Sequence, residues 1–278
     1  MPAIYAHMRF GEAVNATLPP SFSEITEKYP EAFCLGTQGA DILFYHKPLR
    51  SNPIKKKGSD VHHTSADGFF ATQAKRLIEE NKALGKAEND LPDSAFAAYL
   101  MGFLCHFTLD VYCHPKIYEL EATGVSHGRI ESEFDKYFLK KDGKPIRGYN
   151  VGMHMHPDNG TAEACAKTLD VTEEQSRLSI KTMRKINGWF SCKCEAFHML
   201  AHVVLKIVKM ENKFGGMFLH KKDEPHCTQL NPILEERWTA AIDRAATLIQ
   251  GYFTSLPEIA NNGEMDEFFR NNYTGGPI

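Results

Sequence analysis

The stretch AFAAYLMGFLCHFTLDVYCHP, residues 95–115, decides the fold class of this chain. From Ala95 to Cys105 it carries no charged side chain and almost no polar one. A helix that is apolar on all sides is buried, and this run is too short to span a bilayer. The stretch therefore predicts a core helix over about Asp93 to Cys113 and no transmembrane segment.

Three polar residues, His106, Asp110 and His114, follow this apolar run at intervals of four. At 100° per residue they lie within roughly 80° of one another on one helix face. A buried carboxylate is costly unless it is paired or binds a metal, and a metal ion would engage all three side chains. The alternative is a His–Asp hydrogen bond that holds the core together. Pro115 disfavours the helical conformation at His114, so we expect the helix to end there.

A second pair with the same spacing, His127 and Glu131, lies on the next predicted helix, from about Ser126 to Lys140. Taken alone, the pair also fits a surface histidine at a helix start, with a glutamate favoured by the helix dipole. Two such sets on consecutive helices instead favour bound divalent metal. Histidine and carboxylate donors with few thiols indicate zinc first.

The remainder of the chain is dominated by helix signals, and alternating strand patterns are nearly absent. We therefore predict an all-α protein, with residues 1–278 forming a single helical domain. Its metal-site half covers about 1–145 and its C-terminal helical half about 160–278. Asn52 to Asp60, which contains proline and glycine, is predicted to be a loop. Further helices are expected at about 65–83, 172–190, 192–212 and 231–256.

Composition narrows the class of partner and the location. The chain has 278 residues, 24% of them charged, and a formal net charge of -3. This charge and the lack of basic–aromatic clusters argue against a nucleic-acid partner. The seven cysteines show no disulfide spacing, and the first residues show no secretory signal, so we expect a cytoplasmic protein.

Several other polar residues are candidate site residues, but none of them indicates a metal site by itself. Asp41 enters an apolar run directly after the glycine-containing turn 36–40, which suits either a rigid site or a helix cap. His62 and His63 precede the helix expected near Ser65, and His7 lies in the first predicted helix. His198 and His202 are interpreted as core or crevice side chains.

The order of these motifs resembles that of a known family. AHMRFG, GTQGADILFY, GSDVHH, YLMGFLCHFTLDVYCHP and HGRIESEFD follow one another between about Ala6 and Tyr137. Together they are similar to the bacterial zinc-dependent phospholipase C family, whose all-helical fold is shared with zinc single-strand nucleases. The resemblance implies a multi-helix bundle with a metal site between its helices.

The resemblance also implies two or three zinc ions. Asp110 would bridge two of them, and Asp41 would bind one and act as the catalytic base. His63 remains a rival of His62. The implied ligands are His7, Asp41, His62, His106, Asp110, His114, His127 and Glu131. Two departures are visible: the family's N-terminal tryptophan ligand is absent, and Asp110 and His114 are closer together than in the secreted enzymes.

The implied activity is hydrolysis of a phosphodiester, with phospholipid as the first substrate class and transient contact with a membrane surface. Two alternatives stay open at this point. One is a non-catalytic protein that uses metal for folding energy, and the other is a hydrolase similar to the single-strand nucleases.

Overall fold

The computed structural model describes residues 4–276, which form helices and no β-strand. The all-α prediction is confirmed. In chain order the elements are α1 (Ile4–Asn15), α2 (Pro20–Lys28), α3 (Pro30–Gly36), the 3₁₀ helix η1 (Gly39–Tyr45), α4 (Pro53–His63), α5 (Ala66–Ala83), α6 (Ala95–Glu121), α7 (His127–Lys141), α8 (Asn159–Leu169), α9 (Glu173–Phe190), α10 (Glu195–Ile207), α11 (Glu211–Phe214), η2 (Gly215–Met217), α12 (Pro225–Thr254), α13 (Leu256–Asn262) and η3 (Glu267–Arg270).

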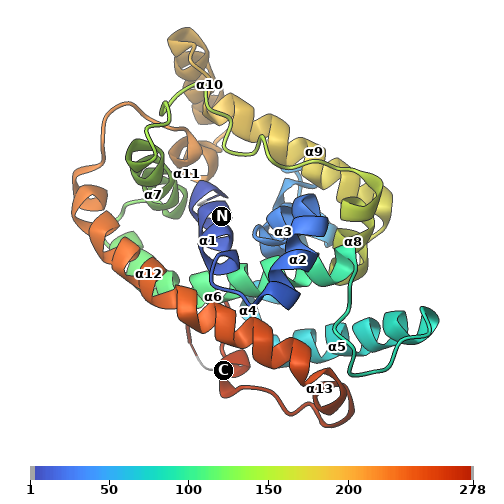
Figure 1. Cartoon of the computed structure of the whole chain (residues 1–278). Coiled ribbons are helices and arrows are strands. Elements are labelled where there is room, and N and C mark those ends of the chain that lie inside the picture. Colours follow the sequence, from blue (N-terminus) through green and yellow to red (C-terminus); the bar gives the residue numbers. More distant parts are fainter. Residues whose placement is uncertain (1–3, 277–278) are drawn as a thin grey trace.

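The apolar helix α6 is the axis of the bundle. It packs most extensively against α3 and α12, and also against α1, α7 and α8 (Figure 1). A window of α6 is long and apolar enough to cross a membrane, but 89% of it is buried inside the protein. Helix α6 is therefore the core helix that the sequence predicts.

Two glycines allow α3 and α6 to approach very closely. A Cβ atom on Gly36 would lie 2.1 Å from the carbonyl oxygen of Tyr99, and one on Gly102 would lie 2.1 Å from that of Phe33. Any larger residue at either position would force the two backbones apart. This contact fixes the segment that follows α3, and so places η1 beside the polar end of α6.

Two sequence predictions about prolines were wrong. The predicted loop Asn52 to Asp60 is mostly helix α4, because Asn52 accepts a hydrogen bond from the Lys55 backbone N–H (3.0 Å) and Pro53 occupies the first helical turn. Helix α6 does not end before Pro115 but continues to Glu121. Packing of this buried helix outweighs the lost backbone hydrogen bond at the proline.

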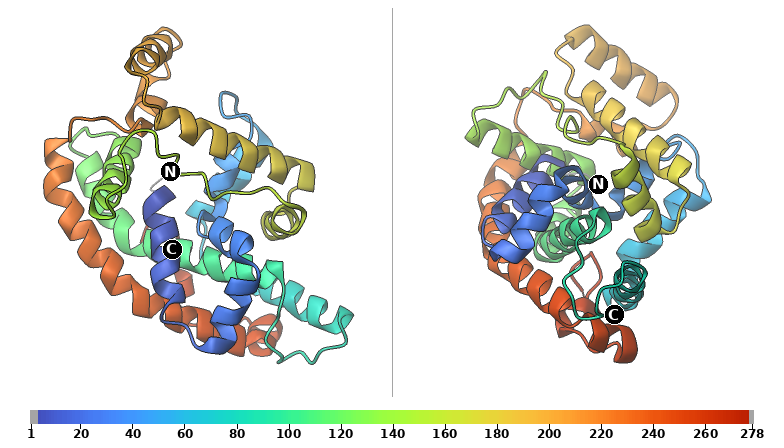
Figure 2. Two further views of the ribbon diagram at one scale, coloured as in Figure 1. Left: turned by 45° about the horizontal axis from the view of Figure 1, so that its top comes forward. Right: turned by 45° about the vertical axis from the view of Figure 1, so that its right-hand side comes forward.

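Helix α8 was missed, and α9 to α11 form a rim at one side of the bundle. Both views of Figure 2 show α10 at the periphery, projecting away from the other helices. Its inner side packs on a small apolar cluster separate from the main core, formed by Phe190, Phe214, Met217 and Phe218.

Candidate metal centre

The first group of metal-ligand side chains combines three elements that are distant in sequence. Asp41 lies on η1, His62 near the end of α4 and His106 on α6, and their donor atoms lie within 4.8 Å of one another. His62 Nε2 is 3.2 Å from Asp41 Oδ1. All three residues are buried, with 9% or less of their surface exposed, and a carboxylate in such a place needs a cation or a proton nearby.

The second group joins α6 to α7. The donor atoms of His114, His127 and Glu131 lie within 4.8 Å of one another. Glu131 Oε1 is 3.2 Å from His127 Nε2 and 3.8 Å from His114 Nε2. Because α6 continues through Pro115, His114 keeps the same helix face as Asp110, and it turns its Nε2 toward α7.

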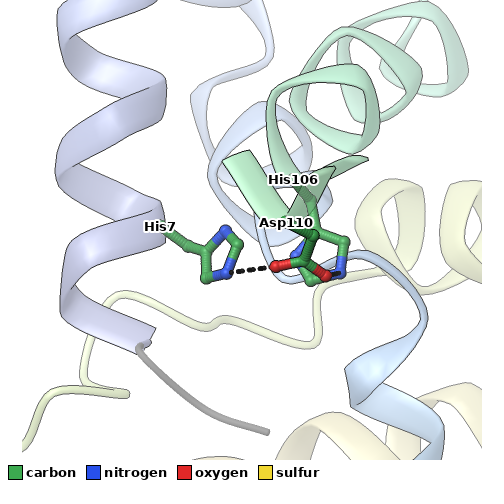
Figure 3. Close-up of side chains that lie close together, drawn as sticks. All are labelled: His7, His106 and Asp110. Atoms are coloured by element: carbon green, nitrogen blue, oxygen red, sulfur yellow. Dashed lines mark ion pairs between the residues drawn. The ribbon is translucent and has the colours of Figure 1, made fainter. Parts of the chain in front are cut away.

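Asp110 forms the third group with His7 and His106, with donor atoms again within 4.8 Å of one another. It lies between the other two groups, and its two carboxylate oxygens face different histidines. Oδ1 is 3.2 Å from His7 Nε2, and Oδ2 is 3.3 Å from His106 Nε2 (Figure 3). Oδ2 is also 3.9 Å from His114 Nδ1. Figure 3 shows His7 reaching the site from the first turns of α1, opposite His106. This is the arrangement that a carboxylate bridging two ions requires.

Three histidines share one pattern of ring orientation. In each ring the Nδ1–H group donates to an oxygen outside the ligand groups. His62 donates to the Gly58 carbonyl (2.7 Å), and His114 donates to the Tyr273 carbonyl. His127 donates to Glu121 Oε2 (3.0 Å). These oxygens only accept, so Nδ1 carries the hydrogen in each ring. The Nε2 atom then presents either a lone pair or a second proton to a carboxylate. Lone pairs that face carboxylate oxygens fit a shared metal ion, and outer partners of this kind orient metal-binding histidines.

His106 gives the strongest test of whether metal fits. Its side chain is fully buried, and neither ring nitrogen has a hydrogen-bond partner. The 3.3 Å contact to Asp110 lacks hydrogen-bond geometry. Leaving such a group unsatisfied costs about 1–3 kcal/mol, whereas a bound ion would satisfy Nε2. The donor set therefore fits zinc.

Gly39 makes room for His106. Its φ of +52° lies in the left-handed region, and a Cβ atom there would be 2.0 Å from Cδ2 of the His106 ring. The His106 ring is also enclosed by the rings of His7, His62 and Tyr273. Glycine at this position therefore serves the backbone turn and the placement of His106 together.

The protonation states follow from burial and from the neighbouring charges. Burial lowers the pKa of His106 to about 4, so this ring is neutral and ready to coordinate. Burial alone raises the pKa of Asp110, but the surrounding histidines outweigh it and hold that pKa well below its usual range. Burial also opposes charge on His114, yet Asp110 and Glu131 raise its pKa to about 9. Without metal, His114 thus carries the balancing proton.

Two contributors were missed by the sequence argument. Glu121 lies six residues before His127 and accepts a hydrogen bond from its Nδ1–H (3.0 Å). Tyr273 comes from the opposite end of the chain, is fully buried, and packs its ring 5.0 Å from that of His62. No local sequence pattern marks either residue as part of a metal centre.

Three other histidines considered in the sequence, His63, His198 and His202, lie outside the three groups of metal-ligand side chains. His63 is exposed and its Nδ1–H donates to the Ser59 carbonyl (2.7 Å), whereas its neighbour His62 points inward to Asp41. His198 is buried and bonds the Cys192 carbonyl (2.9 Å). His202 pairs with Glu211 (2.8 Å), a carboxylate partner that the sequence argument had not found.

A cavity of about 420 Å³ opens onto the ligands. It is lined by Asp41, His62, Asp110, His114 and His127, with aromatic walls from Phe44, Tyr118 and Tyr273. A closed four-ligand site is typical of structural zinc, and access from a cavity is typical of catalytic zinc. The ligands reach a space in which a substrate can be held.

Fold and site thus define an all-α protein with clustered histidine and carboxylate ligands beside a cavity. The family model described as zinc-dependent phospholipase C matches residues 6–189 of the chain. The chain belongs to the zinc-dependent phospholipase C family, as its motifs predicted. No curated protein and no solved structure matches the chain.

Proposed function

We propose that this protein is a zinc-dependent hydrolase that cleaves phosphodiester bonds of phospholipids. The observation that carries the proposal is that Asp41, Asp110 and three histidines of the ligand groups line one open cavity. Family membership supports phospholipid as the substrate class. The cytoplasmic location predicted from the sequence remains a part of this proposal.

In this proposal three sets of side chains hold metal. Asp41, His62 and His106 would form one set, His7, His106 and Asp110 a second, and His114, His127 and Glu131 a third. Asp110 joins the sets, and His7 approaches its outer oxygen. Bound zinc supplies a Lewis acid for the phosphate ester and lowers the pKa of water in the site.

The chain's own residues position the reactants. Asp41 lines the cavity, and we assign it the role of orienting the attacking water and accepting its proton. Tyr118 packs beside His114 (ring centroids 5.4 Å apart) and forms a wall of the same cavity. This wall and Phe44 limit the access of bulk water to the phosphate.

The proposal is tested with zinc-loaded protein and a chromogenic choline phosphodiester. We expect turnover that chelation abolishes and that Asp41→Asn lowers by at least about a hundredfold, which is the usual contribution of a general base. Asp60→Asn is the matched control, because Asp60 is exposed on the same α4 that carries His62. Zinc-loaded protein that turns over no phosphodiester would support the non-catalytic alternative, and turnover of single-stranded nucleic acid alone would support the nuclease alternative.

A further inference from the structure

The outer side of α10 carries an apolar surface that nothing in the described structure covers. Its large side chains are Met199 (67% exposed), Leu200, Val203, Val204 and Ile207 (74% exposed). At 100° per residue they occupy an arc of about 140° on the helix. Trp189 and Leu49 extend the same apolar surface and are also exposed. We call this set the outer face of α10.

The helix has a second apolar side that accounts for its attachment. Phe197, Ala201 and Leu205 pack inward on the cluster around Phe190 and Phe218. The exposed residues are therefore not needed to hold α10 to the protein. A contiguous apolar surface of this kind marks an interaction site, because soluble proteins keep such patches small.

An apolar groove lies beside the outer face of α10 and adjoins the metal cavity. The groove encloses about 300 Å³ and lies between α9, α10 and the segment that contains Pro48 and Leu49. Leu200 and Val204 contribute to its lining. Pro48 and Phe214 line both this groove and the metal cavity, so the two spaces adjoin. An elongated ligand with a polar phosphate and an apolar chain would fill both.

The positive charges of lysines around the outer face of α10 are complementary to the negative surface of an anionic lipid bilayer. Lys193, Lys206 and Lys209 are exposed beside or within the α10 segment. Lys185 lies over the half-exposed ring of Trp189, with Nζ 5.0 Å from the ring centroid. An apolar helix face with lysines along its border and a tryptophan at its edge is the composition of an interfacial helix.

We propose that the outer face of α10 docks on a phospholipid bilayer and that the adjoining groove receives an acyl chain of the lipid being cleaved. The inference rests on the proposed function, because it supplies the substrate to the same metal cavity. The family match ends at residue 189, so α10 itself lies beyond the matched region. A second copy of the chain is the competing occupant that the test must exclude.

The test measures co-sedimentation of the zinc-loaded protein with vesicles of phosphatidylcholine containing phosphatidylglycerol. The double variant Met199→Glu with Ile207→Glu removes two side chains that are largely exposed and lie outside the groove, so it retains zinc content and unfolding midpoint. We expect its vesicle affinity to fall by more than about tenfold, from the lost apolar burial. Ile233→Glu, at an apolar residue of α12 that is 44% exposed, is the control for a charge placed elsewhere on the surface, and it retains wild-type affinity.

The two proposals fail separately. Turnover of a soluble short-chain phosphodiester without any vesicle binding would overturn the docking inference and leave the proposed function standing. Vesicle binding that the outer-face variant abolishes, without turnover of any phosphodiester, would support docking and overturn the proposed function. Light scattering measures whether a second copy of the chain occupies the outer face of α10 instead. A wild-type dimer that the double variant converts to a monomer would overturn the docking inference.

Discussion

Replacing Gly39 with alanine should weaken the metal centre by displacing the His106 ring, although the substitution changes no metal-ligand side chain. The new Cβ would lie 2.0 Å from the His106 ring, and ordinary contact begins near 3.4 Å. The His106 ring would have to move by more than 1 Å, and it is enclosed by His7, His62 and Tyr273. A displacement of that size is enough to disable a catalytic site.

The backbone strain of this substitution can be separated from its effect on His106. A non-glycine residue in the left-handed region costs about 1–2 kcal/mol. Gly85 has a similar φ of +69°, but its Cβ would meet no atom within 4 Å. Gly85→Ala should therefore show the strain alone, whereas Gly39→Ala should show a larger loss of stability together with a loss of zinc affinity.

The assay is a competitive zinc titration against a chromogenic chelator, combined with denaturant unfolding of the metal-free proteins. We expect Gly39→Ala to weaken zinc binding by at least about tenfold, since the His106 contribution is lost. Gly85→Ala should bind as the wild type does. Wild-type zinc affinity in Gly39→Ala would refute the assignment of His106 as a ligand.

Three further predictions concern the supports of the site. Glu121→Gln weakens the hydrogen bond that orients His127 and should lower zinc affinity by about tenfold. This is the small end of the usual range, because the Glu121 side chain is partly exposed. Glu119→Gln, at an exposed residue on the same helix turn, should show wild-type affinity in the same titration. The pKa of His114 is raised from 6.5 to about 9, so its protonated form stabilises the metal-free fold fully below pH 6.5, and this contribution is lost as pH rises through 9. Thermal unfolding in the presence of a chelator should show that loss. An unfolding midpoint unchanged between pH 6.5 and 9.5 would contradict the raised pKa of His114. Zinc binding at pH 7.5 should release protons into a weakly buffered solution, because His114 must deprotonate to coordinate, and uptake without proton release would contradict its role as a ligand.

The sequence predicted those parts of the site that a single helix arranges. His106, Asp110 and His114 share one face because α6 repeats every 3.6 residues, and His127 and Glu131 share a face of α7 for the same reason. The prediction extended past these helices only through the order of the motifs. His7, Asp41 and His62 reach the centre through tertiary packing, which no periodicity encodes.

The failures have physical causes that can be named. Pro53 and Pro115 were interpreted as breaks, although one starts a helix and the other lies inside a buried one. Tyr273 supports His114 from 159 residues away, and that contact depends on how the C-terminal segment packs against α6. The unusual exposure of α10 was equally invisible, because apolar residues lie on both of its sides and sequence alone does not say which side is covered.

The central claim is that Asp110 joins two metal groups, and elemental analysis of zinc per chain tests it most directly. Protein loaded with zinc and then desalted should hold two or three ions per chain, and Asp110→Asn should lose at least one of them. Asp60→Asn should retain all of them, since that carboxylate is exposed and outside every ligand group. A wild-type chain without stoichiometric zinc, or an unchanged count in Asp110→Asn, would contradict the account.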